Sequence, residues 1–164
     1  MCGITGFLNY RQLPADSVPI LKKMLACIQY RGPDESGIFL NNQVALGSVR
    51  LSIIDISSGQ QPLSTTDGQY WIVFNGEIFN YLEISRELTT LGHRFSTESD
   101  TEVLLHAWLE YGADCLNQLN GQFAFAIWDN IKKELFLARD RVGIRPLFYT
   151  WKNNTFIFGS EIKT

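Results

Sequence analysis

The stretch QFAFAIWD, residues 122–129, decides the fold, because every position from Phe123 to Trp128 is apolar. An apolar run of this length, followed by turn residues around Asn130, is typical of a β-strand that is covered on both faces. Strands with one face in water instead alternate apolar and polar residues. The sequence therefore predicts that this strand lies in a sheet with a packed layer on each side.

Other strand-like stretches flank this one on both sides along the chain. They are rich in β-branched and aromatic residues, and turn-forming pairs such as Asn41-Asn42 and Asp67-Gly68 separate several of them. The stretches expected to form strands cover residues 4–8, 37–40, 44–54, 69–75, 134–140, 146–151 and 155–160.

Three helices are expected between these strands. The first begins near Asp16 and Ser17, which can cap it, and it ends at the RGPD segment because Pro33 cannot continue a helix. The other two cover residues 81–91 and 101–111, and each stops at a glycine.

The order of the elements indicates the fold class. Strands, then a pair of helices, then strands again predict an α+β fold of two packed sheets with helices on the outside. The second helix of the pair follows Ser99 and Glu102, whose spacing predicts a capping box. No internal repeat, low-complexity tract or linker interrupts this order, so we expect one domain over residues 1–164.

Composition and charge exclude several function classes. The chain has 164 residues, and its 14 Lys+Arg and 17 Asp+Glu give a formal charge of −3 without the basic run that indicates nucleic-acid binding. Its apolar runs are shorter than the roughly 20 residues of a membrane-spanning helix, and the pattern of a signal peptide is absent. Three widely spaced cysteines suggest neither a disulfide framework nor a zinc site. We therefore expect a cytoplasmic protein with no nucleic-acid or membrane partner and no metal.

The commoner nucleotide and hydrolase motifs are also absent from the sequence. It contains no Walker A motif, no GxGxxG after a strand and no GxSxG elbow. Its two histidines, His93 and His106, have no nucleophile or metal-ligand partner nearby in the sequence. Both histidines are therefore expected to have structural roles.

Cys2 is a candidate nucleophile because of its position in MCGITGF. Once the initiator Met is removed, Cys2 carries an α-amino group with an ordinary pKa of about 7.7 to 8.0. That amine can accept the thiol proton and later return a proton to a departing amine, so no histidine is required. The alternative is that Cys2 is a small apolar residue at a frayed terminus.

The segment FNGEI, residues 74–78, offers an oxyanion hole at the end of an apolar strand. Asn75 can donate from its side chain and Gly76 from its backbone N–H, with no Cβ to keep the substrate away. The alternative is an ordinary Asn-Gly turn. A two-residue hairpin turn should lead directly into another strand, whereas Glu77 and a helix follow here.

Three charged residues suggest recognition of a free α-amino acid. Arg50 can hold a carboxylate in a bidentate contact, and Glu77 and Asp100 can pair with an ammonium group. Each charge taken alone also fits a solvated surface position, and Asp100 fits the start of a helix. Their occurrence together with Cys2 and the Asn-Gly pair favours the binding site.

Taken together, these residues resemble a known family. The chain is similar to the glutaminase domain of class II glutamine amidotransferases, and within them to the glutamine-hydrolysing asparagine synthetases. The match covers nearly the whole chain. The motifs that carry it, all in family order, are MCGITGF, RGPDESG, RLSIIDISSGQQPL, FNGEIFN, SDTEV, GQFAFAIWD, RDRVGIRPLFY and SEIK.

The resemblance implies a fold and a reaction. The fold is that of the N-terminal-nucleophile (Ntn) hydrolases, a four-layer αββα sandwich of two antiparallel sheets. Cys2 would attack the side-chain amide of L-glutamine, giving a γ-glutamyl thioester and ammonia, with Asn75 and Gly76 as the oxyanion hole. The substrate-binding residues that it implies are Arg50, Leu51, Ser52, Ile53, Ile54, Asn75, Gly76, Glu77 and Asp100.

The sequence departs from the family in two places. Tyr30 stands before RGPD, where these synthetases usually have His, and nothing after SEIK resembles the ATP-using synthetase domain. We therefore expect ammonia to pass to a synthetase partner domain outside this chain. ATP and Mg²⁺ are expected only there, and no cofactor for the glutaminase step. Two alternatives stay open: the glutaminase domain of another class II amidotransferase, and a non-catalytic glutamine-binding or regulatory module of the same fold.

Overall fold

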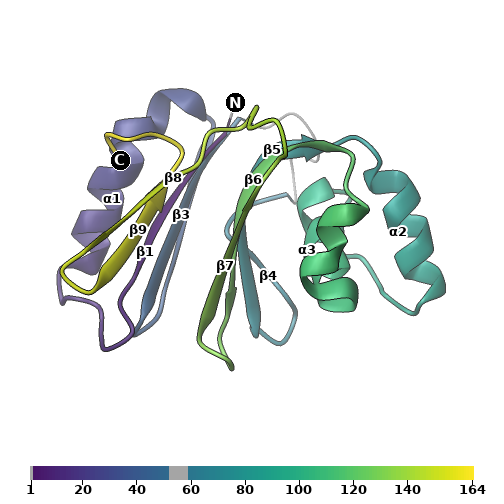
Figure 1. Cartoon of the computed structure of the whole chain (residues 1–164), viewed down its shortest axis with the longest axis horizontal. Helices are drawn as coiled ribbons and strands as arrows, with labels where there is room; N and C mark the ends of the chain where they lie inside the picture. The colour runs from purple at the N-terminus through teal and green to yellow at the C-terminus, as the bar shows by residue number, and fades with distance from the viewer. Residues whose placement is uncertain (1, 52–58) are drawn as a thin grey trace.

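The computed structural model describes residues 2–51 and 59–164, which form four layers. Two antiparallel sheets pack face to face, and helices cover the outer face of each sheet (Figure 1). This arrangement confirms the predicted αββα sandwich.

The first sheet has the strand order β2-β3-β1-β9-β8, and every neighbouring pair is antiparallel. Helix α1 (Ser17–Ile28) packs on its outer face and continues into the short 3-10 helix η1 (Gln29–Arg31). The strands are β1 (Gly3–Leu8), β2 (Glu35–Leu40), β3 (Val44–Arg50), β8 (Phe148–Lys152) and β9 (Thr155–Gly159).

The second sheet has the strand order β4-β5-β6-β7 and is also antiparallel throughout. Helices α2 (Tyr81–Thr90) and α3 (Asp100–Tyr111), with the 3-10 helix η2 (Gly112–Asn117), cover its outer face. The strands are β4 (Leu63–Ser64), β5 (Tyr70–Ile78), β6 (Gly121–Asp129) and β7 (Glu134–Arg139).

Strand β6 lies at the centre of the molecule and is buried from Phe123 onward. Phe123 and Phe125 belong to the core beneath α2 and α3, whereas Ala126 and Trp128 belong to the core between the two sheets. Side chains of a strand alternate between its faces, so an all-apolar strand supplies both cores. The prediction that this strand is covered on both faces is confirmed.

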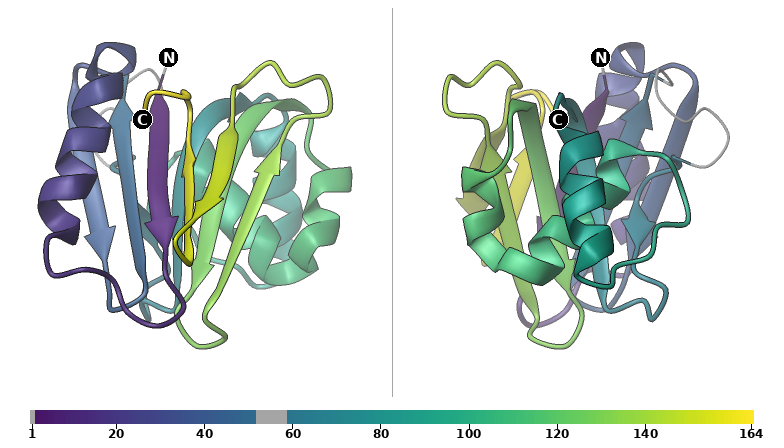
Figure 2. Two further views of the ribbon diagram at one scale, coloured as in Figure 1. Left: turned by 60° about the vertical axis from the view of Figure 1, so that its left-hand side comes forward. Right: turned by 90° about the vertical axis from the view of Figure 1, so that its right-hand side faces the viewer.

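The two ends of the described chain lie at the same end of the sandwich (Figure 2). The register of β1 against β9 explains this, because Thr5 pairs with Gly159 and the strands run in opposite directions. The last residues of the chain therefore return to the neighbourhood of Cys2.

The structure corrects the predicted position of Asn75 and Gly76. The sequence placed them at the end of a strand, but β5 continues through them to Ile78. The reason is β6, which pairs with β5 along its whole length, up to the pair Ile78 and Gly121.

The predicted helix caps are only partly correct. Asp16 makes no side-chain capping bond to α1, and the Ser17 hydroxyl donates to the Pro14 carbonyl instead. At α3 the Ser99 hydroxyl does accept from the Glu102 N–H, at 3.2 Å. The Glu102 carboxylate does not complete the capping box, because it accepts hydrogen bonds from the loop that precedes Ser99.

Among the described residues, no helix combines the length and the apolar character that crossing a membrane requires.

Candidate active site

A cavity of about 260 Å³ lies where the ends of β1, β3, β5 and α3 meet. This volume is slightly below the roughly 300–1,000 Å³ of pockets for drug-sized ligands, so it suits a small molecule such as an amino acid. Every predicted site residue that the structure describes lines it: Cys2, Arg50, Leu51, Asn75, Gly76, Glu77 and Asp100. The predicted residues Ser52, Ile53 and Ile54 lie outside the described part of the chain.

Cys2 lies directly before β1 and is held by its backbone and its sulfur. Its thiol lies 3.7 Å from the Leu51 carbonyl oxygen. Its own carbonyl oxygen accepts a hydrogen bond of 3.1 Å from Arg31 Nε. Arg31 is in turn fixed by an ion pair of 3.0 Å with Glu161, which follows β9. Segments from both ends of the chain therefore position Cys2.

Arg31 belongs to RGPD, for which the sequence suggested no role beyond ending a helix. Gly32, which follows it, passes so close to β3 that a Cβ there would lie 2.5 Å from the backbone nitrogen of Arg50. The Asp34 N–H donates to the Arg50 carbonyl at 3.2 Å. This segment therefore connects the residue that holds Cys2 with the predicted carboxylate-binding residue.

Asn75 is the buried polar group of the cavity, with only 1% of its surface exposed. Neither the oxygen nor the nitrogen of its carboxamide has a hydrogen-bond partner among the described residues. Leaving such a group without a partner costs about 1–3 kcal/mol. A buried carboxamide without these partners can therefore form hydrogen bonds with a ligand bound in the cavity.

Gly76 must be a glycine for a reason that differs from the predicted one. The sequence suggested that a Cβ would obstruct the substrate, but an added Cβ would lie 2.3 Å from the Gln122 carbonyl oxygen of β6. The neighbouring strand therefore excludes a side chain. The Gly76 N–H faces the edge of β5 that is away from β6, because successive backbone groups of a strand alternate in direction.

Asp100 begins α3 and is 6% exposed. Its carboxylate accepts a hydrogen bond of 3.0 Å from the Ile78 N–H. The pKa of Asp100 is raised to about 6, mainly because the carboxyl group is buried and also because the Glu77 carboxylate is near, while the Ile78 hydrogen bond partly opposes the rise. A cation bound between Glu77 and Asp100 would stabilise both carboxylates in their charged form, so the pair is suited to an ammonium group.

Arg50 ends β3 and is 6% exposed. Its Nη1 forms an ion pair of 3.1 Å with Glu35 on the neighbouring strand β2. A planar guanidinium held in this way presents its donors in a fixed direction, as recognition of a carboxylate requires.

Of the six further residues that line the cavity without being predicted site residues, Arg145 and Gln61 have the longest polar side chains. Arg145 follows β7, and its buried Nε has no hydrogen-bond partner among the described residues. Gln61 precedes β4 and contacts both β5 and α3 through its side chain. The motif matches that contain these residues were the only sequence signal for them.

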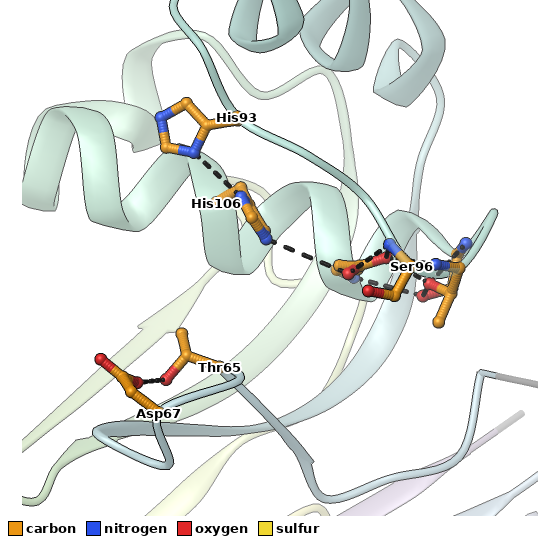
Figure 3. A network of polar contacts seen from close by, with 8 residues as sticks. Thr65, Asp67, His93, Ser96 and His106 are labelled. Atoms are coloured by element: carbon orange, nitrogen blue, oxygen red, sulfur yellow. Dashed lines mark hydrogen bonds and ion pairs between the residues drawn. The ribbon is translucent and has the colours of Figure 1, made fainter.

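The two histidines do not line the cavity and contact each other instead (Figure 3). His93 Nδ1 lies 2.9 Å from His106 Nδ1, and His93 Nε2 lies 2.9 Å from a Glu110 oxygen. Burial lowers the pKa of His106, and the Glu102 carboxylate partly offsets this effect. Within the described ranges, no group of three or more His, Cys, Asp or Glu side chains is arranged to hold a metal ion.

Comparison with known proteins identifies the family. The family model described as "Glutamine amidotransferase domain" matches residues 1–164. The chain belongs to this family. This glutamine amidotransferase domain is 46% identical over 166 residues to asparagine synthetase [glutamine-hydrolyzing] 1 of Bacillus subtilis (strain 168), which covers all of this chain. It is 43% identical over 165 residues to asparagine synthetase [glutamine-hydrolyzing] 3 of the same organism, covering 99% of this chain. The resemblance predicted from the motifs is therefore confirmed.

The aligned segments are 26% and 27% of the lengths of these two relatives, so this glutamine amidotransferase domain spans about a quarter of either. Among solved structures, it matches the glutamine phosphoribosylpyrophosphate amidotransferase from B. subtilis complexed with ADP and GMP. The TM-score is 0.80 at 25% sequence identity, over 98% of this chain and 42% of that one. This match supports the Ntn-hydrolase fold.

Proposed function

We propose that this domain hydrolyses L-glutamine to L-glutamate and ammonia through a γ-glutamyl thioester on Cys2. The family and the names of the relatives give the substrate. The observation that carries the proposal is the Asn75 carboxamide, which is buried without a partner in the same cavity as the Cys2 thiol.

The reaction begins with proton transfer from the Cys2 thiol to its own α-amino group, which is free once Met1 is removed. The sulfur attacks the side-chain amide carbon of glutamine, and Asn75 Nδ2 and the Gly76 N–H bind the resulting oxyanion. As the carbon–nitrogen bond breaks, the α-ammonium group gives its proton to the leaving nitrogen, which departs as ammonia. A water molecule then gives a proton to the amine and attacks the thioester, which releases glutamate and restores the thiol.

Charged groups at the other end of the cavity orient the substrate. In the proposed complex, Arg50 binds the α-carboxylate and Glu77 and Asp100 bind the α-ammonium group. The backbone at Leu51 completes the pocket, together with the predicted contributions of Ser52, Ile53 and Ile54. The nucleophile, the proton acceptor and the oxyanion donors are all protein groups, so the proposal includes no cofactor or metal for this step.

The ammonia is proposed to pass to a synthetase domain of the asparagine-synthetase type, where ATP and Mg²⁺ would be used. The two B. subtilis relatives, which are about four times as long as this chain, support this part of the proposal. A cytoplasmic location also belongs to the proposal, and the free state of Cys2, Cys27 and Cys115 supports it.

The test is ammonia release from glutamine labelled with nitrogen-15 at the side-chain amide. Labelled ammonia and an equal amount of glutamate are expected from the wild type, and neither from Cys2→Ala. A matched control is Cys27→Ala, which replaces an exposed cysteine away from the cavity. If the wild type binds glutamine but releases no labelled ammonia from a processed N-terminus, the chain is a non-catalytic binding module instead.

A further inference from the structure

The outer edge of β5 presents three backbone N–H groups next to the cavity, from Phe74, Gly76 and Ile78. The Gln69 carbonyl accepts from the Asn130 N–H and the Phe79 N–H donates to the Asn120 carbonyl, at the two ends of the pairing between β5 and β6. The backbone N–H and C=O groups of odd-numbered residues on β5 therefore face β6. Those of even-numbered residues face the edge away from β6. Strand β4 covers that edge only as far as Ile72. Beyond Ile72, side chains rather than a strand accept hydrogen bonds from the N–H groups of Phe74 and Ile78.

Gln61 binds the first of these three N–H groups, that of Phe74. It stands two residues before Leu63, which pairs with Ile72, so the same register places it opposite Phe74. Its side-chain Oε1 accepts from the Phe74 N–H at 2.7 Å. The side chain of Gln61 therefore takes the place of the next carbonyl group of β4.

The other end of the Gln61 carboxamide binds helix α3. Its Nε2 donates to the Thr101 hydroxyl at 3.2 Å, and Thr101 is 4% exposed. The residue before it, Asp100, accepts from the Ile78 N–H at 3.0 Å. Gln61 and Asp100 thus bind β5 on either side of Gly76, and the first turn of α3 joins them.

The backbone of Gln61 is fixed to the other sheet. Its carbonyl oxygen accepts from the Ser48 hydroxyl of β3 at 3.0 Å. A Cβ added at Gly37 of β2 would lie 1.9 Å from that oxygen, so the two backbones are in tight contact. Gln61 is therefore connected to both sheets and to α3, and it lines the cavity between them.

We propose that Gln61 is a positioning residue that sets the span between the oxyanion-binding pair Asn75-Gly76 and the ammonium-binding Asp100. This inference rests on the proposed function. A glutamine molecule must reach both groups at once, with its side-chain carbonyl at one and its α-ammonium group at the other. Asparagine is one methylene shorter, so the same span selects glutamine.

The test compares Gln61→Met with the matched variant Gln60→Met, whose side chain is exposed and outside this hydrogen-bond chain. Methionine keeps the length of glutamine but neither accepts from Phe74 nor donates to Thr101. A misplacement of about 1 Å costs about a hundredfold in rate, so Gln61→Met should lower kcat for glutamine to about that extent with a smaller change in KM. The preference of kcat/KM for glutamine over asparagine should fall in parallel.

A second variant, Thr101→Val, tests the same connection from the side of the helix. It should also lower kcat. The double variant should lose less kcat than the two single losses combined, because both substitutions remove the same connection between Gln61 and Thr101. If Gln61→Met does not fold, the kcat of Thr101→Val provides the test. The proposal is overturned if the folded variant keeps kcat within about twofold of Gln60→Met, or if the preference for glutamine does not change. A wild type that releases no ammonia overturns the proposed function instead.

Discussion

At the scale of single residues, the site depends on polar groups that the fold leaves ready for a substrate. Asn75 shows this most directly, because both polar atoms of its buried side chain lack partners among the described residues. Replacing it by alanine should lower kcat about a hundredfold, the usual effect of removing one oxyanion donor. Glutamine KM should change little, because the charged groups at the other end of the cavity remain.

Steady-state ammonia release measures this effect, with Asn42→Ala as a control at an exposed turn position. Turnover of Asn75→Ala equal to that of the control would remove Asn75 from the oxyanion hole.

Asp100 combines a cost in stability with a proposed role in substrate binding. Its folded pKa of about 6 lies above the ordinary value of 3.8, so the folded protein holds this proton more tightly than the unfolded chain. The charged carboxylate therefore destabilises the fold at pH 7, by at most about 3 kcal/mol, and this cost disappears as the pH falls from above 6 toward 4.

The substitution Asp100→Asn should accordingly raise Tm at pH 7 but not at pH 4, since asparagine can still accept from the Ile78 N–H. It should also raise the glutamine KM about tenfold or more, because the ammonium group loses a charged partner. In the wild type, KM should rise as the pH falls below about 6. Calorimetry and a pH series of KM test both effects, and a lower Tm at pH 7 would contradict the assigned cost.

At the scale of elements, the start of α3 carries Asp100, the proposed ammonium-binding residue. The Ser99 hydroxyl caps this helix through the Glu102 N–H. Ser99→Ala should therefore lower the free energy of unfolding by about 1 kcal/mol. Urea unfolding measures the change, and Thr66→Ala at an exposed position serves as the control. An unchanged midpoint would mean that the loop contacts of Glu102 hold the helix end without the cap.

The elements also show which features can be predicted from the sequence. The strong patterns predicted the long strands, the three helices and two packed sheets with helices outside, because apolar runs and turn residues are local signals. The family resemblance added the four-layer αββα sandwich. Strand β4 was missed, since two residues beside Pro62 carry no periodicity. The contacts of Gln61 with Phe74 and of Arg31 with Cys2 join segments 13 and 29 residues apart. Such contacts arise from sheet register, which no local pattern encodes.

At the scale of the whole molecule, the site depends on how the two sheets pack. Ala124 and Ala126 of β6 are fully buried between them, beside Trp128. Small residues there let the sheets approach closely. Ala126→Leu should therefore destabilise the fold by about 1–3 kcal/mol through overpacking.

The matched control is Ala113→Leu, at an exposed position in η2. Thermal unfolding should separate the two variants by several degrees. Equal Tm values would show that the inter-sheet layer has room for a larger side chain.

The same packing brings Cys2 of the first sheet to Asn75 and Gly76 of the second, and the central claim concerns what activates the thiol there. The most direct test compares ammonia release by two preparations of the domain, one beginning at Cys2 and one verified by mass spectrometry to retain Met1. If the α-amino group of Cys2 is the proton acceptor, the second preparation should be slower by about a hundredfold or more. Equal rates from the two preparations would contradict the account and assign the activation of Cys2 to another group.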